Sequence, residues 1–292
     1  MDRCPLEIIG EIYAFACSDD GRTGRALSLV SRYINETSKP YKLQSVTVVG
    51  HTQLFAFANL IENTPILFRR VHCIFLSAHS RHTASDPRAL SPEYVQRQQS
   101  YAAVERILLA IASCVKVVHA FFVFYRPFIL LPVSLPALEE LMLHGPFETS
   151  AEVDEQIQFI SLKHLNMTSS CSPSYLLNKV LKLTPSVIHL SISASDRSEA
   201  VATEWSSILN NKDIILPTRL ERLYIHVPNQ PKDDFSQLRA LYDRIILALR
   251  CLAETDPRVV LVLPLRLDLF SMVSIQEAIT TWSASAAGKP WW

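Results

Sequence analysis

Apolar residues recur along the chain in one pattern: two positions three residues apart, then a third two residues later. The alternation of its last two positions is typical of a strand with a buried face, and helical patterns fill most of the intervals. Copies of the pattern start at Leu43, Val71, Val115, Leu138, Leu162, Val187 and Leu220, with a weak last copy from Pro257 to Leu263. The predicted helices are Leu54–Glu62, Tyr94–Ser113, Ser174–Leu183, Ala200–Leu209 and Phe235–Ala253.

This pattern resembles the frame of leucine-rich repeats, in which each unit has one strand and one helix. Neither element buries its apolar face alone, so neighbouring units stack into a continuous core. The resemblance implies an α/β arc over residues 46–282, with parallel strands on the concave side and helices on the convex side. The copies are irregular, and the usual Asn or Cys after each strand is missing. An ordinary α/β domain built from βαβ units is the alternative.

The first 45 residues have a different pattern. Residues 4–16 predict a helix that begins near Pro5, and Ile8, Ile12 and Phe15 form one apolar stripe. Ile9, Tyr13 and Ala16 form a second stripe on a neighbouring side. After the turn residues 19–21, a second helix is predicted from Arg25 to Asn35. Such short helices bury too little surface to fold alone, so this segment must pack against the rest of the chain, against a partner protein, or both.

The same segment resembles an F-box. Its opening, Cys4-Pro5-Leu6-Glu7-Ile8-Ile9 with Ile12-Tyr13, is similar to the first half of that motif, and Leu29-Val30-Ser31-Arg32-Tyr33-Ile34 is similar to the second half. The sequence of the whole stretch is similar to that of F-box proteins of mushroom-forming fungi. Cys4, Ile34 and the helical Gly10 depart from the usual motif. A resemblance at this level covers residues 4–45 only.

The F-box resemblance implies a function by binding. F-box proteins dock on a Skp-type adaptor, and through it on a cullin scaffold, as substrate-recognition subunits of SCF-type (Skp–cullin–F-box) ubiquitin ligases. The repeat domain would hold the target protein, and other subunits would perform the transfer. The implied adaptor-binding positions are Pro5, Ile8, Ile9, Ile12, Tyr13, Leu27, Val30 and Ile34. For each of these, packing inside the helical unit is an equal alternative.

A protein-binding scaffold without any ligase is the second hypothesis, in which the N-terminal helices only cap the repeat domain. The two hypotheses differ in a visible feature. Exposed apolar residues on the first helix favour the adaptor-binding function, whereas their burial against residues 43–49 favours the scaffold. The predicted organisation is a helical domain at 1–45, the repeat-like domain at 46–282 and a flexible tail at 283–292.

The amino-acid composition argues against several other classes of function. Lys and Arg balance Asp and Glu in the 292 residues, which argues against a nucleic-acid or anionic-membrane surface. With no signal-like start and no long apolar run, the chain is expected to be intracellular, cytoplasmic or nuclear, without a membrane segment. The six cysteines are scattered among apolar residues, as in reduced proteins. Only six glycines occur, with no phosphate-binding cluster, and no hydrolase motif is present.

No enzyme activity and no cofactor are therefore expected. His72, Cys73, His79 and His82 are the nearest approach to a metal cluster, but His72 and Cys73 are adjacent in a predicted strand and point to opposite faces. Arg69, Arg70, Arg219 and Arg222 flank strand starts. They either line a binding face or lie at solvated strand ends.

Overall fold

The computed structural model divides the chain into two compact units, which are described separately. Unit 1 comprises residues 1–122, 131–138 and 274–292, and unit 2 comprises 123–130 and 139–273. The structure describes residues 4–79, 94–122, 128–129, 133–145, 147–148, 159–168, 176, 180–193, 203–205, 207–208, 219–227, 230, 236–263 and 273–289.

Unit 1 begins with three short helices: α1 (Leu6–Ala16), α2 (Arg22–Val30) and α3 (Arg32–Ser38). The prediction of one helix from Arg25 to Asn35 was wrong, because the chain is extended at Ser31 (φ −162°, ψ 163°). The Ser31 hydroxyl accepts a hydrogen bond from the Ile34 N–H at 3.2 Å and so caps α3. A serine that satisfies this donor favours a new helix start over helix continuation.

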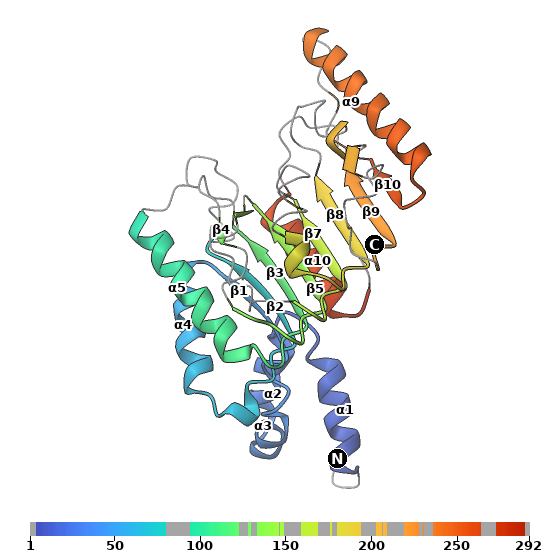
Figure 1. Ribbon diagram of the computed structural model, residues 1–292. Coiled ribbons are helices and arrows are strands. Elements are labelled where there is room, and N and C mark those ends of the chain that lie inside the picture. Colours follow the sequence, from blue (N-terminus) through green and yellow to red (C-terminus); the bar gives the residue numbers. More distant parts are fainter. Residues whose placement is uncertain are drawn as a thin grey trace. The chain divides into compact units, whose positions relative to one another are not determined.

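Three parallel strands follow in unit 1, in the order in which they occur along the chain. They are β1 (Ser45–Val49), β2 (Cys73–Ser77) and β3 (Val117–Phe121), with Val46 beside Ile74 and Ile74 beside Val118. The connections contain α4 (His51–Asn63), the 3-10 turn η1 (Ile66–Phe68) and α5 (Tyr94–Ile111). Helices α4 and α5 pack side by side (Figure 1).

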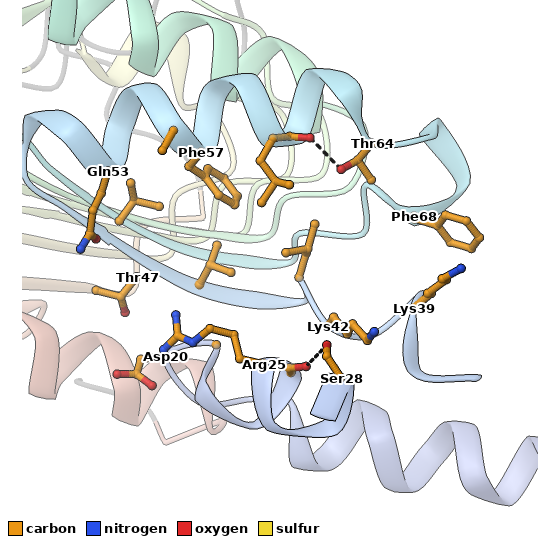
Figure 2. Close-up of a pocket in the computed structure, with 17 residues that line it drawn as sticks. Asp20, Arg25, Ser28, Lys39, Lys42, Thr47, Gln53, Phe57, Thr64 and Phe68 are labelled. Carbon is orange, nitrogen blue, oxygen red and sulfur yellow. Dashed lines mark hydrogen bonds between the residues drawn. The ribbon is translucent and has the colours of Figure 1, made fainter. Parts of the chain in front are cut away.

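Helix α10 (Ile275–Ala286) is an element that the sequence analysis did not predict. It packs on β2 and β3, and the ring of the fully buried Trp282 lies edge-on to Phe75, 6.2 Å between centroids. Phe75 and its ladder neighbour Thr47 share one strand face. Thr47 points away from Phe57 of α4 (Figure 2). Helices therefore cover both faces of this ladder, a departure from the predicted arrangement with helices on one side only.

Unit 2 contains a second parallel ladder, also in chain order. Its strands are β5 (Glu140–His144), β7 (His164–Met167), β8 (His189–Ser193), β9 (Arg222–His226) and β10 (Val259–Val262). The other described elements are the pair β4 (Phe128–Ile129) and β6 (Phe147–Glu148), α7 (Leu181–Leu183) and α9 (Ser236–Thr255).

The repeated apolar pattern locates these strands correctly. In β5 its two later positions are Leu141 and Leu143, both fully buried, and Leu165 and Leu190 continue the row of Leu141 across the ladder. The α/β class and the parallel pairing are confirmed in both units. Helices α4, α5 and α9 agree with their predicted segments within a few residues. Much of the predicted helices at 174–183 and 200–209 lies outside the described residues.

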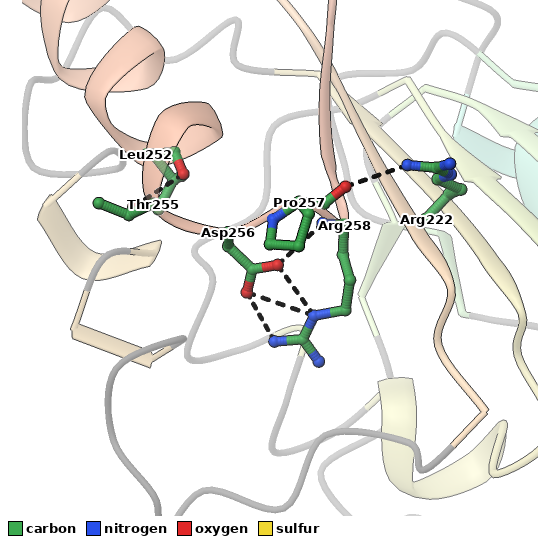
Figure 3. A network of polar contacts seen from close by, with 6 residues as sticks. All are labelled: Arg222, Leu252, Thr255, Asp256, Pro257 and Arg258. Atoms are coloured by element: carbon green, nitrogen blue, oxygen red, sulfur yellow. Dashed lines mark hydrogen bonds and ion pairs between the residues drawn. The ribbon is translucent and has the colours of Figure 1, made fainter.

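A polar network closes the turn between α9 and β10 in unit 2. The Arg258 guanidinium donates to both carboxylate oxygens of Asp256, at 2.6 Å from Nη2 to Oδ2 and 3.0 Å from Nε to Oδ1 (Figure 3). Arg222 of β9 donates to the Pro257 carbonyl at 3.0 Å. Hydrogen bonding to Arg258 lowers the pKa of Asp256. These contacts fix the entry of the chain into β10 beside β9.

Candidate protein-docking surface

Helices α1 to α3 enclose a small apolar core of their own. Ile9, Tyr13 and Ile34 are its buried members, at 5%, 4% and 9% exposure. Cys4, Leu27 and Tyr41 pack against them and are partly buried. Ile9 and Tyr13 are four residues apart, so one stripe of α1 faces this core and the neighbouring stripe is directed elsewhere.

Polar contacts fix the helices around that core. The Tyr13 hydroxyl lies 3.2 Å from the Thr37 hydroxyl and joins α1 to α3. In the turn before α2, the Asp19 carboxylate accepts from the N–H of Gly21 at 3.0 Å and of Thr23 at 2.9 Å. Side-chain acceptors at this position satisfy N–H groups that the first turn of a helix leaves open. The orientation of α2 is therefore set by local sequence.

Two glycines allow the helices to approach the segment before β1. A Cβ at Gly24 would lie 2.3 Å from the Lys42 carbonyl oxygen, and one at Gly10 would lie 2.6 Å from the Tyr41 hydroxyl. Gly10 is one of the departures from the F-box motif, and in a helix it costs about 1 kcal/mol relative to Ala. Here the missing side chain makes room for Tyr41.

The neighbouring stripe of α1 is apolar and exposed. Ile8, Ile12 and Phe15 expose 52%, 56% and 84% of their surface. Leu6 at the start of α1 is 60% exposed, and the end of α2 adds Leu29 at 87%. Val30 and Tyr33 are exposed in the same way, at 61% and 49%. Exposed apolar residues gathered on one short segment are typical of an interaction surface.

The eight predicted adaptor-binding residues divide between surface and core. Pro5, Ile8, Ile12 and Val30 are exposed. Ile9, Tyr13 and Ile34 are buried, and Leu27 is partly buried against them. The exposed residues that the predicted set lacked are Leu6, Phe15, Leu29 and Tyr33. Phe15 was recoverable from its spacing, because it continues the stripe of Ile8 and Ile12 by one helical turn.

The helical segment is also attached to the start of β1. The Gln44 amide donates to the Ala14 carbonyl at 2.9 Å, and the Ser45 hydroxyl donates to the Ser18 carbonyl at 3.4 Å. Cys17 is 1% exposed at this junction, and burial raises the pKa of its thiol to about 11. The exposed stripe of α1 is therefore displayed by a helix that is held in place at its C-terminal end.

Other candidate residues have structural partners. Arg69 donates to the Thr64 and Glu62 carbonyls, both at 2.7 Å, and so closes the end of α4, while Arg222 donates to Pro257 as described above. Phe121, the last residue of β3, and the following Phe122 are buried. Within the described ranges, no three His, Cys, Asp or Glu side chains are close enough to hold a metal ion.

Comparison of the chain with models of protein families, with curated proteins and with solved structures finds no match. Among the helices that the structure describes, none has the length and apolar character needed to cross a membrane. The case for a function therefore depends on the geometry of the chain itself.

Proposed function

We propose that the chain is the substrate-recognition subunit of an SCF-type ubiquitin ligase. Its N-terminal helices would dock on a Skp-type adaptor, which connects to a cullin scaffold, and its α/β part would hold the target protein. The chain would perform no chemistry. It would raise the effective concentration of target lysines near the charged conjugating enzyme.

The observation that carries this proposal is the division of α1 into two apolar stripes. The buried stripe of Ile9 and Tyr13 explains how the helix is held, whereas Ile8, Ile12 and Phe15 are exposed in the part of the chain that the structure describes. Leaving large apolar side chains in water forgoes about 1.5–3 kcal/mol each. Such a surface is expected to be covered by another protein, and its position in the F-box-like segment favours a Skp-type adaptor.

For the target, we propose the polar face of the unit 2 ladder. Glu140, His164, His189 and Arg222 lie side by side in one row of this face. Glu140 is buried, His164 and His189 are half-buried and Arg222 is exposed, so the accessible end of the row is at β9. The rings of His164 and His189 are 5.0 Å apart, and Arg222 is exposed. In the proposed repeat arc, this face would be the concave one.

The scaffold without a ligase remains a second candidate, favoured by the contacts of the helices with the start of β1. The bonds from Gln44 to Ala14 and from Ser45 to Ser18 are those expected of a cap on the ladder. They do not account for the exposed apolar stripe, so the adaptor-binding function is preferred.

The test is co-purification of the full chain with a Skp-type adaptor. The variants are Ile12→Asp on the exposed stripe and Leu109→Asp on α5 as a matched control, because both side chains are exposed and helical, at 56% and 60%. Neither change should disturb folding, which circular dichroism would check. A carboxylate at position 12 would be buried unpaired at the interface, so complex formation should fall by about two orders of magnitude or more.

Binding of the native chain and of Leu109→Asp, with loss in Ile12→Asp, would support the proposal. Failure of the folded native chain to bind the adaptor would leave the scaffold as the better account of α1 to α3.

A further inference from the structure

A groove of about 540 Å³ opens along β1, between α2 and α4 (Figure 2). It is lined on the apolar side by Val46, Val48, Phe57 and Leu60. Phe68 of η1 stands at one end, and Arg25 and Ser28 of α2 form the opposite wall. The groove lies entirely within unit 1 and uses side chains other than the exposed stripe of α1.

Among the strands that the structure describes, β1 pairs with β2 on one side only, so its other side is an open edge. The Gln44 carbonyl accepts from the Cys73 N–H at 3.0 Å, and the Gly50 N–H donates to the Ser77 carbonyl at 2.8 Å. Along a strand, the N–H and C=O groups of successive residues point alternately to its two sides. These two bonds therefore direct the groups of residues 44, 46, 48 and 50 toward β2. Those of Ser45, Thr47 and Val49 therefore point outward, toward the groove.

The outward backbone groups of these three residues are not equally available for hydrogen bonds to an added strand. The Val49 N–H already donates to the Gln53 side chain at 3.1 Å, and Gly21 lies close to the Ser45 carbonyl. Thr47 lies between them and lines the groove. Its hydroxyl oxygen is buried and finds no hydrogen-bond partner in the part of the chain that the structure describes. The hydroxyl lies on the strand face shared with Phe75, so what makes Thr47 a template for an added strand is its outward backbone N–H and C=O.

The groove is also positively charged. Arg25, Lys39 and Lys42 line it, and the acidic residue in its lining is Asp20, which is ion-paired with Arg22 at 3.0 Å. Burial and the neighbouring Lys39 both lower the pKa of Lys42. Glu36, which lies outside the groove lining, is ion-paired with Lys39 at 2.5 Å and partly offsets this lowering of the Lys42 pKa. The Lys42 ammonium donates to the Asn35 side-chain oxygen. A ligand carboxylate would add to or replace these contacts, and the lining would still carry three cations against one carboxylate.

We propose that this groove binds an extended, acidic peptide segment of a partner protein, which adds a strand to β1. The peptide backbone would pair with Thr47, its alternate apolar side chains would contact Val46, Val48 and Phe57, and its carboxylates would contact Lys39, Lys42 and Arg25. Strand addition takes affinity from main-chain hydrogen bonds and specificity from side-chain pockets, and both are present here. This site does not depend on adaptor docking by α1.

The probe is a fluorescein-labelled peptide of sequence Glu-Val-Thr-Val-Thr-Glu, which places a carboxylate near the lysines in either strand direction. Binding to the full chain is followed by fluorescence anisotropy, with a peptide carrying Lys in place of both Glu as control. We expect saturable binding of the acidic peptide alone. Hydrogen exchange at the Thr47 amide should slow about tenfold or more at saturation, as for an N–H that gains a ladder bond.

Two pairs of variants separate the contributions. Thr47→Pro removes the outward N–H and is tolerated at an edge strand, whereas Thr47→Val keeps it; the first should abolish binding and the second should retain it. Arg25→Glu/Lys39→Glu should weaken binding about fivefold or more, and the charge-matched Arg32→Glu/Arg70→Glu should not, since these exposed arginines lie outside the groove lining.

The proposal would be overturned by absence of binding to the folded native chain, or by binding that leaves the Thr47 amide unprotected. Equal loss in both charge variants would also overturn it, since it would indicate a nonspecific charge effect. A dimer of the native chain that Thr47→Pro dissociates in sedimentation would show that the occupant is a second copy of β1. That result would replace the peptide in the proposal.

Discussion

Ile8 and Ile9 are adjacent in α1, yet Ile8 exposes 52% of its surface and Ile9 exposes 5%. One peptide unit separates a side chain in water from a side chain in the core with Tyr13 and Ile34. An acidic substitution at these two positions should therefore have different consequences, one for association and the other for folding.

Ile9→Asp should unfold the helical segment. A carboxylate placed among Tyr13 and Ile34 has no partner there, and an unpaired buried charge costs about 3–5 kcal/mol. Ile8→Asp should stay within about 0.5 kcal/mol of the native chain, as is usual for a surface change. Urea unfolding followed by circular dichroism measures both. Equal stability of the two variants would contradict the burial of Ile9. Of these two variants, Ile8→Asp is the one that, like Ile12→Asp, is suitable for testing adaptor binding.

Glycine 24 should tolerate alanine less well than glycine 10. The Cβ of Gly24→Ala would meet three backbone atoms of Lys42, which move only with the chain, and a loss of about 2–3 kcal/mol is expected for such overpacking. The Cβ of Gly10→Ala would meet the far end of the Tyr41 side chain, and the better helix propensity of Ala returns about 1 kcal/mol. Denaturant midpoints of the two variants provide the comparison. A larger loss for Gly10→Ala would argue against the close approach of α2 to Lys42.

The apolar pattern predicted the strands because each strand buries alternate residues, as Leu141 and Leu143 show. It did not predict which apolar stripe of α1 is buried, since both stripes have similar side chains. That choice depends on Tyr41, which packs against α1 from 31 residues beyond Gly10. Contacts at such sequence distances leave no periodic signal, so the candidate set mixed exposed Ile8 and Ile12 with buried Ile9 and Tyr13.

Helix α10 was missed although its signals are local. Ser274 and Glu277 form a capping box, with the Ser274 hydroxyl accepting from the Glu277 N–H at 3.2 Å and the Glu277 carboxylate accepting from the Ser274 N–H at 2.9 Å. Ile275, Ile279 and Trp282 are spaced as one helix face and are buried. The helix continues to Ala286, so residues 283–286, which were predicted to lie in a flexible tail, belong to it.

Trp282→Ala should destabilise unit 1 because this indole is fully buried against Phe75. Truncation of a buried Trp costs about 3–5 kcal/mol. Ser274→Ala removes one cap of the same helix and should cost about 1 kcal/mol. Thermal or urea unfolding of the two variants should therefore rank them in that order. A negligible effect of Trp282→Ala would mean that α10 contributes little to the ladder it covers.

Acid should destabilise unit 2 through its histidines. Burial, followed by the neighbouring His189, lowers the pKa of His164 to about 4, and burial also lowers the pKa values of His189 and His226. Unfolded histidine has a pKa of about 6.5, so the unfolded chain binds more protons between pH 6.5 and pH 4. The stability contributed by neutral His164 is therefore complete above pH 6.5 and is lost as the pH falls toward 4. For a shift of this size the loss is about 2–3 kcal/mol.

The measurement is urea unfolding of the native chain and of His164→Gln at pH 7.5, 6.0 and 5.0. The glutamine side chain does not titrate, so the free energy of unfolding of the variant should fall less between pH 7.5 and pH 5.0 than that of the native chain. The free energy of unfolding of the native chain should fall gradually below pH 6.5, because protonation of His164 places a positive charge beside the His189 ring, whose centroid lies 5.0 Å away. Parallel pH profiles for the two proteins would show that His164 is protonated equally easily in the folded and unfolded states, and the packing of the two rings would then not control the acid stability of this ladder.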